Sequence, residues 1–170
     1  SPAPDVYARL VGCTTYRQDL IYPPGLRDRR IGGDAGAMPV PAGFASKMAL
    51  HNAYEHFERD ADVRLLREAA RVLRPGGRMC IVPLFLHEHY AIQTDPATHP
   101  REGVPFDEDA LIYCARGWRN RFGRFYDVAH LVSRVRDHLD GLRLTIHVVR
   151  NERQVHPTCY AKFAAVFEKP

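Results

Sequence analysis

Residues 60–86 read DADVRLLREAARVLRPGGRMCIVPLFL, and this stretch decides the fold. Apolar side chains recur at helical spacing from Val63 to Leu73, which predicts an amphipathic helix with Asp60 at its N-cap. The Pro-Gly-Gly sequence that follows is a typical helix stop. Residues 79–86 are almost wholly apolar, as expected of a strand that is buried on both faces.

Two shorter apolar runs precede the helix, one led by Ile31 and one over residues 48–50. A strand, a crossover helix and a second buried strand form a right-handed βαβ unit of a parallel sheet. In such sheets, ligands bind at the carboxyl ends of the strands. Those ends carry Asp34, His51 and His87, so we expect the functional site there.

Three segments carry a family resemblance: GDAGAMPVP (33–41), MALHNAYEH (48–56) and EAARVLRPGGRMCIVP (68–83). In this order they resemble the middle of class I S-adenosylmethionine-dependent methyltransferases, most closely the small-molecule group (methyltransferase type 11-like). The resemblance implies an α/β fold, a Rossmann-like three-layer α/β/α sandwich. Its sheet would be mostly parallel with an antiparallel C-terminal strand, and its cofactor would be S-adenosylmethionine.

The family's first strand and its G-x-G-x-G loop are not found before Asp34. Residues 5–10 would then form the helix after that loop, and residues 12–20 the second strand. On this interpretation the domain is N-terminally incomplete. Its open apolar edges would favour aggregation, strand exchange or a homodimer.

The resemblance also implies the residues that bind the cofactor. Asp19 would hold the ribose hydroxyls, and Asp34 would accept a hydrogen bond from the adenine amino group. The backbone N–H of Ala35 would meet the adenine ring, Met38 would lie against its face, and His51 would lie closest to the transferred methyl group. The residues alone leave simpler roles open, with Asp19 and Asp34 as turn carboxylates and Met38 as part of the core.

Histidines cluster after two of the strands, with Glu55 and Glu88 among them. Methyl transfer to oxygen requires removal of the acceptor's proton, and histidine ordinarily exchanges protons near neutral pH. We therefore predict His51 and His87 as catalytic residues. His87 and His89 would share one face of a strand-like stretch, whereas His56 would be structural. No metal is predicted, although a histidine-bound metal in a hydrolase-like protein stays open as a weaker alternative.

The chain divides into three parts. Residues 1–90 would form the cofactor-side core, and residues 91–126 an inserted lid or substrate loop, of which residues 88–106 are expected to be a long irregular segment. Residues 127–170 would supply a helix and a pair of strands. All three belong to a single methyltransferase-like domain.

Composition limits the class of protein. The chain has 170 residues, a net charge of +4 and no apolar run long enough to cross a membrane, and its basic residues are scattered. We therefore expect no membrane and no nucleic-acid partner. The four cysteines form no C-x-x-C pair and are expected to be reduced in a cytoplasmic protein.

These observations predict S-adenosylmethionine-dependent methyl transfer to an oxygen or nitrogen of a small molecule. The alternative is a non-catalytic binding or assembly module of the same fold that does not bind the cofactor.

Overall fold

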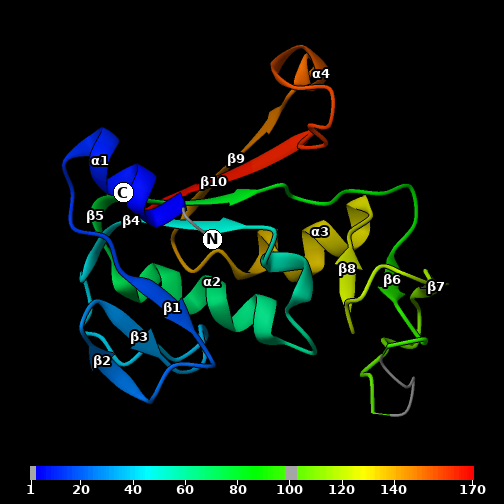
Figure 1. Cartoon of the computed structure of the whole chain (residues 1–170), viewed down its shortest axis with the longest axis horizontal. Coiled ribbons are helices and arrows are strands. Elements are labelled where there is room, and N and C mark those ends of the chain that lie inside the picture. The colour runs from blue at the N-terminus through cyan, green and yellow to red at the C-terminus, as the bar shows by residue number, and fades with distance from the viewer. Residues whose placement is uncertain (1–2, 99–102) are drawn as a thin grey trace.

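The computed structural model describes residues 3–98 and 103–170. Figure 1 shows the helices and strands in chain order. They are α1 (Ala3–Val11), β1 (Arg17–Asp19), β2 (Gly25–Arg27), β3 (Arg30–Gly32), β4 (Ala45–His51), the 3-10 helix η1 (Tyr54–His56), α2 (Ala61–Val72), β5 (Leu73–Val82), β6 (Ala91–Thr94), β7 (Leu111–Cys114), β8 (Gly123–Phe125), α3 (Val128–Arg134), the 3-10 helix η2 (Arg136–His138), β9 (Arg143–Val148), α4 (Glu152–Val155) and β10 (Phe163–Glu168).

The central sheet has the strand order β4-β5-β10-β9. Strands β4 and β5 are parallel, with Met48 beside Met79 and His51 beside Val82. Strand β10 pairs with β5 and with β9 in the antiparallel sense, so the expected antiparallel ending is confirmed. Because the sheets are mixed, they fit an α/β fold, but a mostly parallel sheet is not confirmed.

Helix α2 lies along one face of the central sheet (Figure 1). Its buried face includes Leu65, Leu66 and Ala69, which belong to the main core together with Met79 and Phe167 of the sheet. The expected helix is confirmed, but the Asp60 side chain makes no capping hydrogen bond. That carboxylate forms an ion pair with Arg64 at 3.3 Å instead.

Strand β5 differs from its expected limits at both ends. Leu73 pairs with Ala45 and Arg78 pairs with Lys47, so the Pro-Gly-Gly segment lies in an irregularity of the parallel ladder between them. At the other end the strand stops at Val82, although the apolar run continues to Leu86. Pro83 follows Val82 and has no N–H to donate, which removes one hydrogen bond from any continued ladder.

The N-terminal region forms a separate sheet with the order β1-β3-β2. Strands β1 and β3 are parallel, and Gln18 lies beside Ile31. The β1 strand covers three residues of the longer strand that we expected over residues 12–20.

Residues 91–126, the segment proposed as the inserted lid, have secondary structure of their own. They contain a third sheet, with the order β7-β6-β8. This sheet has its own small core of Ile92, Val104 and Phe122. Residues 99–102 of the expected lid lie outside the described residues. In the part of the chain that the structure describes, no helix is both long and apolar enough for a membrane span.

Candidate functional site

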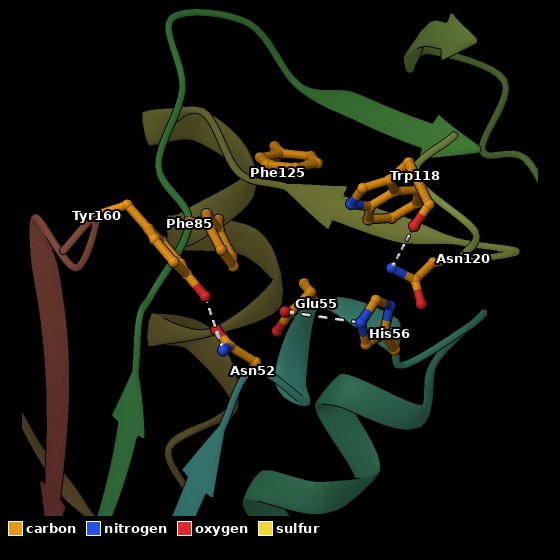
Figure 2. Close-up of a pocket in the computed structure, with 8 residues that line it drawn as sticks. All are labelled: Asn52, Glu55, His56, Phe85, Trp118, Asn120, Phe125 and Tyr160. Atoms are coloured by element: carbon orange, nitrogen blue, oxygen red, sulfur yellow. Dashed lines mark hydrogen bonds and ion pairs between the residues drawn. The ribbon is translucent and has the colours of Figure 1, made fainter. Parts of the chain in front are cut away.

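A cavity of about 360 Å³ lies beyond the carboxyl ends of β4 and β5 (Figure 2). Four segments that are far apart in the sequence build its wall: the turn after β4, the segment after β5, the third sheet and the segment before β10. The polar lining residues are Asn52, Glu55, His56 and Asn120, and the aromatic ones are Phe85, Trp118, Phe125 and Tyr160.

Asn52 connects the two strand ends with the C-terminal part of the chain. Its backbone N–H donates to the carbonyl of Val82 at 3.1 Å, and its φ of +48° turns the chain sharply after β4. The side-chain amide donates to the Tyr160 hydroxyl at 2.8 Å. The other amide atom, Oδ1, is buried and has no hydrogen-bond partner among the described residues.

Glu55 is the buried acid of the cavity, with a side chain only 7% exposed. Burial raises its pKa, and the backbone N–H and the nearby His56 and His51 offset that effect in part. One carboxylate oxygen lies 3.7 Å from Nε2 of His56. The other, Oε2, is buried without a hydrogen-bond partner among the described residues. This oxygen can therefore accept a hydrogen bond or a proton from a bound molecule.

His56 joins the cavity to the third sheet. Its Nδ1 lies 2.5 Å from the carbonyl oxygen of Phe122. Since a carbonyl only accepts, the geometry assigns the hydrogen to Nδ1, and Nε2 then faces Glu55. The His56 ring also lies 5.8 Å from the Trp118 ring, centroid to centroid. His56 thus lines the cavity as well as packing, beyond the structural role expected from the sequence.

Aromatic rings form the rest of the wall. The Phe85 and Phe125 centroids are 5.2 Å apart, with their planes inclined by 59°. The Phe85 and Tyr160 rings are nearly parallel, with centroids 6.4 Å apart. Trp118 lies across the cavity from Tyr160 (Figure 2). The cavity is therefore mainly apolar, with a few polar groups at fixed positions, as is usual for small-molecule sites.

The two histidines predicted as catalytic do not line this cavity. His51 is exposed at the end of β4, next to Asn52. His87 is also exposed, on an irregular stretch rather than a strand-like one, and its ring centroid lies 6.2 Å from that of Tyr113. Their catalytic roles stay predictions. Among residues 3–98 and 103–170, no three His, Cys, Asp or Glu side chains are grouped to hold a metal ion.

Of the residues predicted to bind the cofactor, Asp19 ends β1, Asp34 and Ala35 follow β3, and His51 ends β4. The N–H of Gly33 donates to the carbonyl of Asp19 at 3.4 Å and joins the ends of β1 and β3. The Asp34 carboxylate accepts from the N–H of Gly36 at 2.8 Å and from Arg64 at 2.7 Å. Ala35 is half-buried beside them.

Met38 is held against α2. Its backbone N–H donates to the buried carboxylate of Glu68 at 2.6 Å, and its side chain packs with Ile31, Val40 and Val72. The side chain thus belongs to a small core, and its predicted contact with adenine stays a prediction.

The hydrogen-bond acceptors at these strand ends are of a kind that suits adenosine. Carboxylates accept from ribose hydroxyls and from an adenine amino group, and Asp19 and Asp34 both lie at carboxyl ends of parallel strands. Asp34 already has two partners, but a carboxylate offers about four lone-pair positions, so it retains the capacity to accept.

A buried polar network connects the third sheet to α2. The side chains of Asp62 and Arg124 are both fully buried, and their ion pair is 3.0 Å long. Tyr126 donates to the same carboxylate at 2.7 Å, and Arg134 of α3 forms a further ion pair with it at 2.7 Å. Arg124 also donates to the carbonyls of Phe57 and Arg59. These contacts fix the third sheet against the start of α2 and so position Trp118 and Phe125.

Sequence reasoning placed Glu55 among the histidines and Trp118 in the lid, but it did not select Asn52, Phe85 or Tyr160. The position of Asn52 directly after a parallel strand was a usable signal. No local sequence pattern identifies Tyr160 as a cavity residue, because its hydrogen-bond partner Asn52 lies 108 positions away in the sequence.

Comparison with known proteins shows which domain family and which solved structures this chain resembles. The model of the methyltransferase domain family matches residues 11–81. No curated protein matches the chain. A solved 1,6-didemethyltoxoflavin-N1-methyltransferase from Burkholderia thailandensis, with bound 1,6-didemethyltoxoflavin and S-adenosylhomocysteine, has a TM-score of 0.59 at 16% identity. It is similar over 97% of this chain and 65% of its own.

A S-adenosylmethionine-dependent methyltransferase from Methanosarcina mazei has a TM-score of 0.52 at 13% identity, over 82% of this chain and 66% of its own. This chain thus spans about two thirds of the length of either structure. By the match over residues 11–81 and by the fold of both structures, this chain is similar to S-adenosylmethionine-dependent methyltransferases.

Proposed function

We propose that this protein binds S-adenosylmethionine and transfers its methyl group to an oxygen or nitrogen of a small molecule. The observation that carries the proposal is the cavity beyond β4 and β5, with a volume of about 360 Å³. It is lined by Glu55, whose buried Oε2 has no hydrogen-bond partner in the part of the chain that the structure describes. Cavities of roughly 300–1,000 Å³ are typical of small-molecule sites.

The bound cofactor supplies an electrophilic methyl group on a sulfonium, so the protein's task is mainly alignment and proton removal. Asp19 and Asp34 would accept hydrogen bonds from the ribose and the adenine amino group, with Ala35 and Met38 beside the ring. The aromatic wall of the cavity would hold the acceptor in a fixed plane.

The acceptor atom loses a proton when it gains the methyl group. Glu55, supported by His56 at 3.7 Å, is the cavity group that can take this proton. Its raised pKa makes the carboxylate a stronger base than an exposed glutamate. His51 and His87 are proposed as further proton carriers at the mouth of the site.

We also propose the layering of the fold and the division of the chain into parts. The whole domain would be a Rossmann-like three-layer sandwich, divided into a core (1–90), a lid (91–126) and a C-terminal part (127–170). Its acceptor would be a small molecule rather than a nucleic acid, and a homodimer would cover the open strand edges.

The alternative is a non-catalytic module of the same fold, which one observation favours. Several large apolar side chains of the N-terminal region are exposed, and Leu10, Leu20 and Ile21 are each more than 70% exposed. Surfaces of this kind often mediate assembly.

Calorimetric titration with S-adenosylhomocysteine tests the proposal. We expect saturable binding that Asp34→Asn weakens about tenfold, since a hydrogen bond to a charged group is lost. Asp60→Asn is the matched control, because Asp60 is the other carboxylate that pairs with Arg64 and has no proposed ligand. Absence of binding in the unmodified protein would favour the non-catalytic module.

A further inference from the structure

The cavity that contains Glu55 carries information about the chemical class of its ligand. The inference deepens the proposed function, on which it rests, by naming the class of methyl acceptor. Three independent features of the described residues bear on it: the shape of the wall, the hydrogen-bonding groups that lack partners and the charges of the lining.

The wall favours a flat, unsaturated molecule. Phe85, Phe125 and Tyr160 present ring faces and edges from three different segments, and Trp118 closes the opposite side (Figure 2). Aromatic rings prefer offset-stacked or edge-to-face contacts with one another, so such a wall binds a planar ring better than a saturated chain or a sugar.

The unpaired polar atoms are both acceptors. Oε2 of Glu55 and Oδ1 of Asn52 are buried and have no hydrogen-bond partner among the described residues. A buried oxygen without a donor is costly, and a ligand that supplies the donor recovers that cost. The matching group on a flat ring is an N–H, either a ring nitrogen or an amino substituent.

The charges of the lining exclude an acidic ligand. Among the described residues that line the cavity, none is a lysine or an arginine, and Glu55 is the acid. A carboxylate or phosphate placed here would face Glu55, and the described lining offers no lysine or arginine to offset the repulsion.

We infer that this cavity binds a planar aromatic or heteroaromatic ring that carries an N–H donor, and that Glu55 and Asn52 accept hydrogen bonds from it. The methyl acceptor is then a ring nitrogen or an aromatic amine. Trp118, in the segment between β7 and β8, and Phe125 of β8 form the outer wall of the ring's binding site.

Trp118 is the chain's single tryptophan, so its fluorescence reports occupancy of the cavity directly. Three probes are titrated without cofactor: benzimidazole, which has a ring N–H; N-methylbenzimidazole, in which a methyl group replaces that hydrogen; and naphthoate, a flat anion. Calorimetry provides a second measurement of each dissociation constant.

We expect benzimidazole to bind about tenfold or more tightly than N-methylbenzimidazole, since the methylated ring leaves the buried carboxylate unpaired. Naphthoate should bind weakest. Glu55→Leu should abolish the difference between the two benzimidazoles. Glu58→Leu is the matched control, because Glu58 pairs with Arg121 and does not line the cavity.

Equal affinity for the two benzimidazoles in the unmodified protein would overturn the inference, as would tightest binding of naphthoate or no binding of any probe. The comparison of probes needs no variant, so it stands even if Glu55→Leu does not fold. Binding of S-adenosylhomocysteine without discrimination among the probes would overturn this inference alone. Discrimination without S-adenosylhomocysteine binding would instead remove the proposed methyl transfer.

Discussion

The carboxylate of Asp62 and the guanidinium of Arg124 form an ion pair of 3.0 Å in which both side chains are fully buried. Asp62 lies in the first turn of α2, and Arg124 lies in β8 of the third sheet. Burial disfavours the charge on Arg124, but Asp62 and the other acidic groups around it outweigh that effect and raise its pKa. The guanidinium therefore stays charged, and the pair fixes the third sheet against the core.

Loss of this pair should destabilise the fold more than loss of an exposed one. Arg124→Met should lower the free energy of unfolding by about 3 kcal/mol, because Asp62 stays buried with fewer partners. The control is Arg78→Met, whose ion pair with Glu168 is largely exposed and should cost less than about 1 kcal/mol. Urea unfolding of both variants measures the two values, and equal losses would contradict a structural role for Arg124.

The buried Glu55 should make stability depend on pH. Its pKa is raised in the fold, so the folded protein binds more protons than the unfolded chain between the ordinary glutamate pKa and the raised one. Stability should therefore fall as the pH rises through this window. Glu55→Gln should remove that part of the pH dependence, whereas Glu58→Gln should keep it. Unfolding free energies measured across acidic to neutral pH would show an unchanged slope in Glu55→Gln if the prediction is wrong.

Glu55 should also matter for turnover once an acceptor is in hand. Glu55→Gln should lower kcat by roughly a hundredfold, since general-base catalysis contributes about 10²–10⁴. In the unmodified protein kcat should rise with pH through the raised pKa of Glu55, because the ionised form is the base. If Glu55→Gln kept the pH dependence of kcat seen in the unmodified protein, a group other than Glu55 would take the proton.

His51 provides a test of the histidine prediction. His51→Ala should lower kcat about tenfold or more while changing S-adenosylhomocysteine affinity by less than about twofold, as expected of a proton carrier. His147→Ala, at an exposed position of β9, is the control. Parallel loss of turnover and of cofactor affinity would remove His51 as a base.

Gly123 controls the position of Trp118. A Cβ at Gly123 would lie 2.6 Å from Cη2 of Trp118, so Gly123→Ala should displace the indole and shift its emission. The matched variant is Gly36→Ala, whose Cβ would meet Cβ of Arg64 at 2.8 Å and leave Trp118 in place. The emission spectra of the two variants are compared with each other. Identical emission would show that the Trp118 ring does not pack against Gly123.

Several elements could be read from the sequence because their signals are local. The helical spacing in residues 63–73 predicted α2, and the helix and strand pair expected within residues 127–170 correspond to α3, β9 and β10. Pro83 indicated that β5 would stop at Val82. The predicted strand was too long at this end because the apolar run continues to Leu86. The third sheet was missed because β6, β7 and β8 have three or four residues each, too few for a clear period.

By itself, the sequence determined the parallel βαβ unit, which depends on periodicity, and the family resemblance, which depends on residues close together in the chain. The antiparallel ending was what that resemblance implied. Only the tertiary structure determined which residues come together to line the cavity. Asn52 and Tyr160 are hydrogen-bonded partners 108 residues apart. Glu55 is a buried acid, and its Oε2 has no hydrogen-bond partner among the described residues, in a cavity that segments distant in the sequence build together. Burial and unsatisfied hydrogen bonding depend on everything packed around a group, and no local pattern encodes them.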